Sequence, residues 1–376
     1  MLINHRRIRK WHFLQLISMC CILSVLMVCW DHVDNHVVSH VKSYSYRYLI
    51  NSYGFINKSL SVSQEDAARF SSFPYLFNQK DICKDKDVLL LLFVKSSPEN
   101  FNRRQAIRST WGNETYMRSE LGVEVKVVFA MGVHKDNGFL QGDLRKESTS
   151  HGDLVQQDFL DTFHNLTVKL LLQFSWMHDN CAHAHFLMSA DDDVFIHMPN
   201  LVRYLQDLKR QNVRNFWVGH VHRGAPPIRS KSSKYYMPFD MYQWSSYPDY
   251  TAGAGYVVSG DVAAKIYQAT LSLNASMYID DVFMGICAIV AGISPQEHVY
   301  FSGEGKTPYH RCIYEKMITS HGHENDIGYL WKAATDPQVK GTSSGVMGRL
   351  YCVAVKMMLL CKPYFSNTYS CTGAFT

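Results

Sequence analysis

Three consecutive carboxylates follow an apolar run in the middle of the chain. Residues 186–194 read FLMSADDDV, so Asp191, Asp192 and Asp193 come directly after a segment suited to a buried central strand. In an open α/β sheet, ligands bind at the carboxyl ends of the strands. Adjacent anionic side chains repel one another there, and a hard divalent ion that bridges carboxylates and substrate phosphates stabilises them. The alternative is a solvated turn, or an N-cap for a helix over residues 198–209.

A second acidic pair, Asp280 and Asp281, begins an apolar helical segment that ends near Gly292. Earlier in the chain, residues 251–255 (TAGAG) permit either close approach of the backbone to a ligand or a tight turn. Residues 222–250 are irregular, basic and aromatic. A long irregular segment inside a compact domain is usually functional.

The segments around these residues alternate between strand and helix patterns. Leu166, Leu170, Phe174 and Met177 recur at helical spacing. Strand–helix alternation predicts an α/β fold with a mostly parallel sheet and helices on both faces. Besides the strand that ends in the acidic triplet, the predicted strands cover residues 88–94, 123–131, 216–221 and 256–259, and the predicted helices cover residues 102–110, 165–177 and 199–210, with a loop or surface helix over 136–153.

The N-terminal region predicts a membrane anchor. The formal charge of the 376-residue chain is only +5, and Arg6, Arg7, Arg9 and Lys10 lie in its first ten residues, so no basic block elsewhere indicates nucleic acid. Residues 13–30 are apolar and uncharged, and their length is at the lower edge of what spans a bilayer as a helix. Basic residues before them and acids after them predict a cytosolic N-terminus. The lack of a small-x-small cleavage site favours a retained type II signal anchor over a cleaved signal peptide.

The remainder of the chain is then expected in the lumen of the secretory pathway. Seven of the ten cysteines follow the anchor, and an oxidising compartment favours pairing them, with at least one left over. N-x-S/T sequons are compatible with this compartment; they occur at Asn57, Asn113, Asn165 and Asn274. The predicted divisions are a cytoplasmic tail (1–12), the anchor (13–30), a luminal stem (31–80), a catalytic domain (81–345) and a C-terminal tail (346–376).

Four motifs, in this order, resemble those of the inverting β-1,3-glycosyltransferases of the Golgi, a family of β-1,3-galactosyl- and β-1,3-N-acetylglucosaminyltransferases. They are RRQAIRSTWG at 103–112, the acidic triplet, YPDYTAGAGYVVS at 247–259 and IDDVFMG at 279–285. The resemblance covers about residues 83–331. It implies a GT-A fold, a Rossmann-like sheet that binds a sugar nucleotide, and a location in the Golgi membrane.

The resemblance also implies roles for the acidic residues. Asp193 would bind a divalent ion, Mn²⁺, directly, while Asp191 and Asp192 would hold ribose, sugar or metal-bound water, Asp191 also being a candidate metal ligand. His321, nine residues after Cys312, resembles the metal-binding histidine of the family; His310 and His323 are the alternatives. Inverting transfer needs one general base beside the acceptor oxygen. The family pattern favours Asp281, with Asp280 as the alternative, and both are compatible with capping the following helix.

Two arginines are candidates for binding the nucleotide. Arg104 and Arg108 lie four residues apart on one face of the predicted helix, where guanidinium groups can bind diphosphate or uridine oxygens. The alternative is pairing with a nearby acid such as Glu99. Trp111 is either a wall of the nucleotide pocket or core. Aromatic residues of the acceptor wall are expected among Tyr236, Tyr242, Trp244 and Tyr247.

Three further stretches narrow the resemblance within the family, at residues 34–53, 221–236 and 301–317. They resemble members that use UDP-GlcNAc as donor and lactosylceramide or other galactose-terminated glycolipids as acceptors. A galactosyltransferase that uses UDP-Gal is the first alternative. A catalytically inactive glycan-binding protein is the second, which the intact DDD and IDDV motifs disfavour. Residues 346–360, apolar and too short to span, would pack on the domain or contact the membrane surface.

Overall fold

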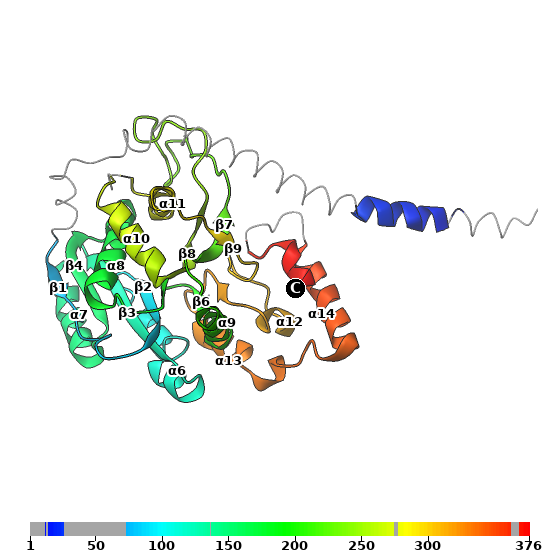
Figure 1. Cartoon of the computed structure of the whole chain (residues 1–376), viewed down its shortest axis with the longest axis horizontal. Coiled ribbons are helices and arrows are strands. Elements are labelled where there is room, and N and C mark those ends of the chain that lie inside the picture. The colour runs from blue at the N-terminus through cyan, green and yellow to red at the C-terminus, as the bar shows by residue number, and fades with distance from the viewer. Residues whose placement is uncertain (1–11, 13, 26–72, 136, 274–276, 362–367) are drawn as a thin grey trace, which may run out of the picture.

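An eight-stranded mixed sheet, in the order β1-β4-β3-β2-β5-β8-β7-β9, runs through the protein (Figure 1). The computed structural model describes residues 12, 14–25, 73–135, 137–273, 277–361 and 368–376. The strands of the sheet are β1 (Tyr75–Phe77), β2 (Val88–Lys95), β3 (Glu124–Val133), β4 (Leu154–Leu160), β5 (Phe186–Asp191), β7 (Trp217–His222), β8 (Tyr250–Ser259) and β9 (Gln296–Glu297). A separate pair joins β6 (Phe195–Ile196) and β10 (Thr319–Ser320).

The expectation of a mostly parallel sheet is confirmed in part. Strands β4, β3, β2 and β5 pair in parallel, as β7 and β9 do. Strand β8, however, is antiparallel to both β5 and β7, and β1 is antiparallel to β4. The TAGAG segment, predicted as a turn or a ligand-binding loop, lies inside β8, and a strand at β4 was not predicted.

Helices cover both faces of the sheet. One core packs α8 (Leu166–Asn180), α10 (Gly260–Thr270) and α11 (Asp280–Val290) on one face. A second core packs the other helices against the opposite face, among them α5 (Phe101–Arg108) and α9 (Met198–Arg210). Side chains of β2 alternate between the cores: Phe93 belongs to the first, Leu92 and Val94 to the second. The remaining helices are α6 (Glu114–Glu120), α7 (Asn137–His151), α12 (Arg311–Tyr314), α13 (Ile327–Ala334) and α14 (Gly345–Leu360).

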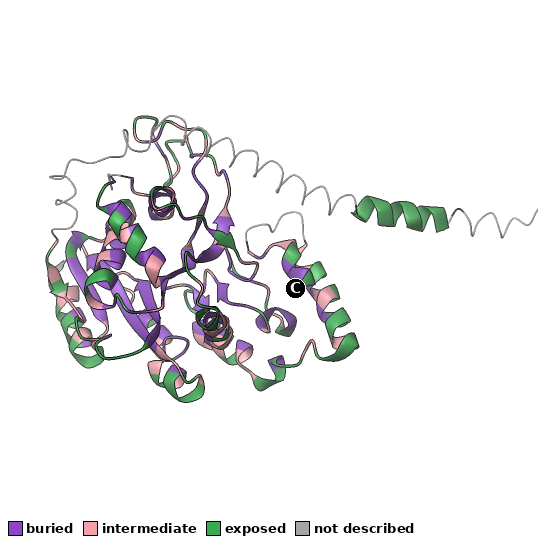
Figure 2. Cartoon of the chain, in the orientation of Figure 1, coloured by how far each residue is buried: buried purple, intermediate pink, exposed green. Residues whose placement is uncertain are grey.

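The termini of the chain differ from the predicted divisions. Residues 73–80, assigned to the stem, contribute β1, and the C-terminal tail contributes α14. Residues 14–25 are helical and their side chains are exposed (Figure 2). Within the described part of the chain, no helix combines the length and apolar character needed to cross a membrane. Residues 13 and 26–30 of the predicted anchor, residues 31–72 of the stem, Asn57 and Asn274 lie outside the described residues.

Three disulfides join six of the seven cysteines beyond the predicted anchor. They are Cys83–Cys181, Cys312–Cys352 and Cys361–Cys371. Cys287, in the middle of α11, is fully buried and free. The odd count of cysteines after the predicted anchor therefore leaves one thiol, as the sequence predicted, and burial raises its pKa.

Candidate active site

Two strands and one helix bring opposite charges together at the carboxyl end of the sheet. Lys95 ends β2 and is paired in register with Asp191 at the end of β5. The buried Lys95 Nζ lies 3.1 Å from Asp191 Oδ1 and 3.0 Å from Asp280 Oδ2. It also donates to the backbone oxygen of Gly253 in β8, at 3.1 Å. The ammonium group of Lys95 therefore holds the acidic triplet to the acidic pair of α11. Lys95 was not predicted as a site residue from the sequence.

Burial and pairing change the protonation of these groups in opposite ways. Burial alone would lower the pKa of Lys95, but the carboxylates of Asp191 and Asp280 outweigh it and raise the pKa. Burial raises the pKa of Asp191; Lys95 opposes this shift, while Asp193 and Asp280 add to it. Lys95 thus remains a cation, and the surrounding negative charge still exceeds it.

The middle acid of the triplet points away from its neighbours and is fully paired. Buried Asp192 accepts hydrogen bonds from Ser96 Oγ at 2.7 Å, Asn100 Nδ2 at 2.9 Å and Arg103 Nη1 at 3.0 Å. These donors belong to the end of β2 and the start of α5. Asp192 therefore fixes α5 against the sheet, and Arg103, rather than Arg104 or Arg108, is the arginine that contacts the triplet.

The outer acids and His321 form a group that could hold a metal ion. Ligand atoms of Asp191, Asp193 and His321 all lie within 4.8 Å of one another. His321 Nε2 is 3.4 Å from Asp193 Oδ1. Among the described residues, this long contact is the one polar contact of buried Asp193 Oδ1, and buried His321 Nδ1 has no hydrogen-bond partner. Carboxylate oxygens and an imidazole nitrogen suit a divalent ion such as Mn²⁺, so the residues fit the group that the sequence predicted.

Asp193 and His321 stabilise each other's charged forms. The Asp193 carboxylate raises the pKa of His321 by hydrogen bonding to it, against the effect of burial. Burial would raise the pKa of Asp193, but hydrogen bonding to His321 lowers it overall. The two alternative histidines have other contacts: His310 caps α12, and fully buried His323 is bonded to Ser320 Oγ at 2.7 Å and Asp326 Oδ1 at 3.0 Å.

The acidic pair of α11 divides into two environments. Asp280 is buried and paired with Lys95. Asp281 is half-buried, accepts a hydrogen bond from the Val282 backbone at 2.7 Å, and has no ion pair within the described residues. Burial and the neighbouring Asp280 carboxylate raise the pKa of Asp281 to about 7. A carboxylate in this state can accept a proton near neutral pH.

Two glycines allow this geometry. A Cβ on Gly253 would lie 3.4 Å from the Cβ of Asp281 and 3.7 Å from Lys95 Nζ, inside the charged cluster. A Cβ on Gly285 would lie 3.1 Å from the backbone oxygen of Asp249, so glycine lets α11 pack closely on the start of β8. Both glycines belong to the motifs at 247–259 and 279–285, which therefore meet in space.

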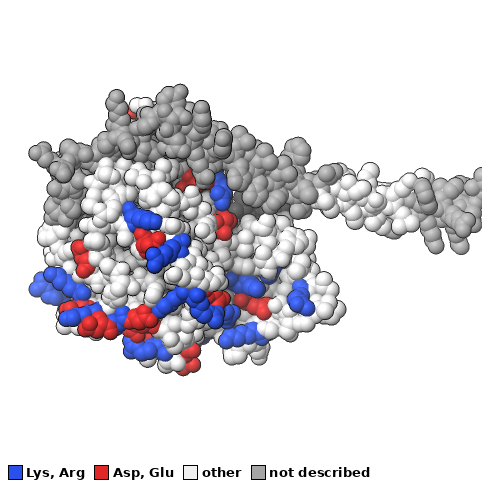
Figure 3. Space-filling model, in the orientation of Figure 1, with Lys and Arg blue, Asp and Glu red and all other residues white. Residues whose placement is uncertain are grey.

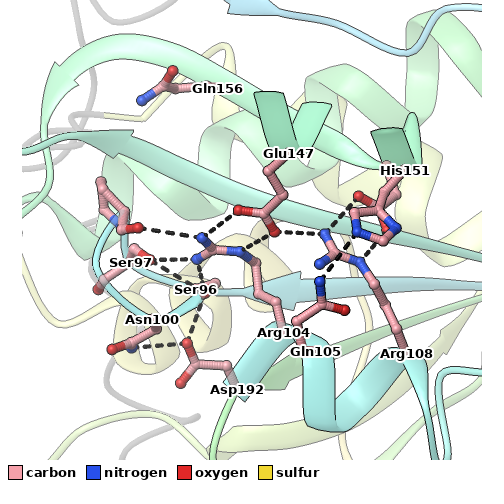
Figure 4. A network of polar contacts seen from close by, with 12 residues as sticks. Ser96, Ser97, Asn100, Arg104, Gln105, Arg108, Glu147, His151, Gln156 and Asp192 are labelled. Atoms are coloured by element: carbon pink, nitrogen blue, oxygen red, sulfur yellow. Dashed lines mark hydrogen bonds and ion pairs between the residues drawn. The ribbon is translucent and has the colours of Figure 1, made fainter. Parts of the chain in front are cut away.

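Arg104 and Arg108 lie in a separate network (Figure 4). Arg104 is fully buried and bonds through Nε and Nη2 to Glu147 of α7, both at 2.8 Å. Its remaining N–H groups are donated to Ser96 Oγ and to the backbone oxygens of Ser97 and Pro98. All five donors of this guanidinium are therefore used.

Arg108 is held in the same network. It pairs with Glu147 at 2.7 Å and with Asp153 at 2.7 Å. The structure does not bring either arginine to the acidic triplet, except through Ser96 Oγ, which donates to Asp192 and accepts from Arg104.

The sequence matches the family described as Galactosyltransferase over residues 102–299. This match covers the acidic triplet and the Asp280–Asp281 pair. The chain belongs to the galactosyltransferase family.

Relatives of the same family align with the whole chain. It is 81% identical over 379 residues, with all of both chains covered, to "Lactosylceramide 1,3-N-acetyl-beta-D-glucosaminyltransferase A" of Danio rerio. It is 58% identical to "Lactosylceramide 1,3-N-acetyl-beta-D-glucosaminyltransferase" of Homo sapiens, covering 100% of this chain and 99% of the relative. The crystal structure of 4-diphosphocytidyl-2C-methyl-D-erythritol synthase matches with a TM-score of 0.30 and 12% identity, over 55% of this chain and 86% of that chain.

The galactosyltransferase match leaves two site residues outside its range. Lys95 precedes residues 102–299, and His321 follows them. Of the aromatic residues expected on the acceptor wall, Tyr242 and Tyr247 are buried in the core with ring centroids 5.0 Å apart, while Tyr236 and Trp244 are half-buried. Trp111 is fully buried core.

Proposed function

We propose that this galactosyltransferase-family protein transfers GlcNAc from UDP-GlcNAc to the 3-hydroxyl of the terminal galactose of lactosylceramide, with inversion at the sugar carbon. One observation carries the donor and the acceptor: 81% identity over the full length to a relative of that name. The stretches at residues 34–53, 221–236 and 301–317, which resemble particular members of the family, support the same donor and acceptor. A GT-A fold is part of the proposal, supported by the site at the carboxyl ends of β2 and β5.

The donor site is assigned to the outer acids and His321. Asp191, Asp193 and His321 would hold Mn²⁺, which when bound supplies a Lewis acid for the charge that develops on the leaving diphosphate. Asp192 holds α5 in place through Arg103 and Asn100. Lys95 keeps the carboxylates of Asp191 and Asp280 together, which positions the start of α11 beside the donor site.

Asp281 is assigned as the general base. The acceptor O3 forms a bond to C1 of GlcNAc, the bond from C1 to the diphosphate oxygen breaks, and the O3 proton passes to the Asp281 carboxylate. The raised pKa of Asp281, about 7, matches this task. Asp280 is the weaker candidate because Lys95 already occupies its carboxylate.

The cellular setting follows from the same assignment. A Golgi enzyme with a type II anchor at residues 13–30 would present the described domain in the lumen, on the same membrane leaflet as the glycolipid head groups. The three disulfides support an oxidising compartment.

The direct test incubates the full chain in detergent with lactosylceramide and either UDP-GlcNAc or UDP-Gal, with and without Mn²⁺, and reads the product by mass. Addition of one N-acetylhexosamine that requires the metal and disappears in Asp281→Asn is expected. Asp261→Asn, which alters a first-turn carboxylate of α10 instead, is the matched control. Addition of a hexose would overturn the donor. UDP binding without transfer to any galactose-terminated acceptor would indicate a glycan-binding protein instead.

A further inference from the structure

Helix α14 presents an apolar face to solvent. It runs over Gly345–Leu360, and its exposed side chains include Val346, Met347, Leu350, Tyr351, Met357 and Met358. Met347 is 79% exposed and Met358 71%. Their spacing of three, four and seven residues places them along one side of the helix. Figure 2 shows this outer side as exposed, while the side toward the domain is buried.

The opposite side of α14 is fastened to the domain. Cys352 is bonded to Cys312 of α12, and Leu360 is buried in the second core. Buried Lys356 donates to Tyr300 Oη at 2.9 Å and to the Thr376 backbone oxygen at 2.8 Å. A second disulfide, Cys361–Cys371, closes the segment after the helix. The apolar face is therefore held outward by a rigid support and cannot turn inward without breaking these contacts.

The charges of this region have one sign. Residues 337–376 contain no Asp or Glu and include Lys340, Arg349, Lys356 and Lys362. Arg349 is the exposed charge of α14 itself, and Lys340 is exposed just before the helix. In the space-filling view the edge of the molecule at α14 is largely uncharged (Figure 3). An exposed apolar stripe in a segment without acidic residues fits a surface that is apolar inside and anionic at its head groups.

We propose that α14 rests on the surface of the phospholipid bilayer that contains the acceptor, with its apolar face toward the acyl chains. The inference rests on the proposed function, because a glycolipid acceptor presents its sugar at this surface. A helix of 16 residues is about 24 Å long, too short to span a bilayer and suited to lie in its interface.

The contact would also orient the catalytic site. Cys312, bonded to α14, begins the segment that leads through β10 to His321. Tyr369 Oη, from the segment after α14, donates to the Thr319 backbone oxygen at 2.6 Å. Docking α14 on the bilayer would therefore hold the segment that carries His321, a candidate metal ligand, at a fixed distance from the membrane surface. The short glycan of a ceramide lies at that same surface.

Photo-crosslinking tests the contact directly. The full chain is reconstituted in vesicles of phosphatidylcholine and phosphatidylserine that carry a diazirine in one acyl chain, and adducts are mapped by peptide mass. Adducts are expected on residues 345–360 as well as on residues 13–30, which serve as the internal positive control. Adducts on 13–30 alone would overturn the proposal.

Substitution tests the consequence for the reaction. Met347→Glu, Leu350→Glu and Met358→Glu are combined, and Leu271→Glu at the exposed end of α10 is the matched control. The combined variant is expected to transfer about tenfold less to lactosylceramide in vesicles, with transfer to a water-soluble lactoside unchanged within about twofold. Equal losses on both acceptors would overturn the docking role. Failure of the unaltered chain on both acceptors would overturn the proposed function, while the crosslinking result would still report on the contact.

Discussion

Two clusters of charged side chains lie against the same sheet and differ in how completely they are paired. In the first, Arg104 uses all five of its donors, and both oxygens of Glu147 accept hydrogen bonds (Figure 4). In the second, Lys95 faces Asp191 and Asp280. Asp193 Oδ1 has only a 3.4 Å contact with His321 Nε2, and His321 Nδ1 has no hydrogen-bond partner among the described residues. Within the described residues, the Arg104–Glu147 pairing is satisfied by the chain itself, although Nη1 of neighbouring Arg108 has no hydrogen-bond partner. We call this first group the complete cluster. The second group, around Lys95 and His321, is the open cluster, because it has binding capacity left for a ligand.

The difference shows why sequence position is a poor guide to the role of a charge. Arg104 belongs to a motif typical of the family, but all of its N–H groups donate hydrogen bonds within the chain. Lys95 belongs to no motif and lies at the centre of the candidate site. A buried polar group without a partner is costly to leave unmatched, and beside Asp191 and Asp193 the free nitrogen of His321 belongs to a group that a cation could complete.

The largest effect is expected from breaking the complete cluster. Arg104→Met leaves Glu147 buried with less compensation, and the free energy of unfolding should fall by about 3–5 kcal/mol. Thermal and denaturant unfolding of the full chain measure this. Adding Glu147→Leu should recover part of the loss. Unchanged stability combined with lost UDP binding would show that Arg104 belongs functionally to the open cluster and would break the distinction.

The next effect concerns Asp281 in the open cluster. Asp281→Asn should lower kcat by about 10³-fold while leaving stability unchanged or higher, because repulsion with Asp280 is removed. The protonated form of Asp281 cannot accept a proton, and burial raises its pKa to about 7. The kcat of the unaltered chain should therefore fall about tenfold per pH unit below that value. A residual rate in the variant with the same pH profile would exclude Asp281 as the base.

A smaller effect is expected from His321, and it sharpens the assignment of the metal group. His321→Asn should weaken the apparent affinity for Mn²⁺ by about 10- to 100-fold, measured as the Mn²⁺ dependence of transfer and by calorimetry. His310→Asn is the matched control because His310 caps α12 and lies outside the group. Equal losses of Mn²⁺ affinity in both variants would show that His321 is not a metal ligand.

The smallest effect separates the middle acid of the triplet from its neighbours. Asp192 accepts three hydrogen bonds and resembles the complete cluster. Asp192→Asn should lower the free energy of unfolding by about 1.5 kcal/mol, with Mn²⁺ affinity changed less than about threefold. A loss of Mn²⁺ affinity as large as that of His321→Asn would place Asp192 in the open cluster.

Local patterns predicted the parts of the fold that depend on short segments. The apolar run before Asp191 predicted β5, the helical spacing from Leu166 predicted α8, and the acidic pair predicted the start of α11. Strand β8 was partly missed because Gly253 and Gly255 weaken strand propensity. A Cβ at either position would lie at ordinary contact distance from its neighbours, 3.6 Å from Thr319 at Gly255 and 3.4 Å from Asp281 at Gly253, so packing alone does not explain these glycines.

Partners that are distant in sequence explain what the patterns could not predict in the site. The alternative of a paired arginine was correct in kind, but the partner of Arg104 is Glu147 on α7 rather than Glu99. Lys95 was missed because it ends an apolar strand and its ion-pair partners, Asp191 and Asp280, are distant in sequence. Only the folded chain brings the three side chains together. The positions of Asp191, Asp193 and His321 in one group agree with the predicted metal ligands, whose role remains a prediction.

The disulfide pattern has a consequence for the order in which the chain matures. The three bonded pairs follow one another along the sequence without overlap, so each pair can close as soon as its second cysteine enters an oxidising compartment. Cys287 is the exception, because it emerges after Cys181 and before Cys312. In the folded protein, burial inside α11 keeps this thiol away from exchange with the disulfides. A variant that exposes Cys287 is therefore expected to form mixed disulfides, which non-reducing peptide mapping would detect.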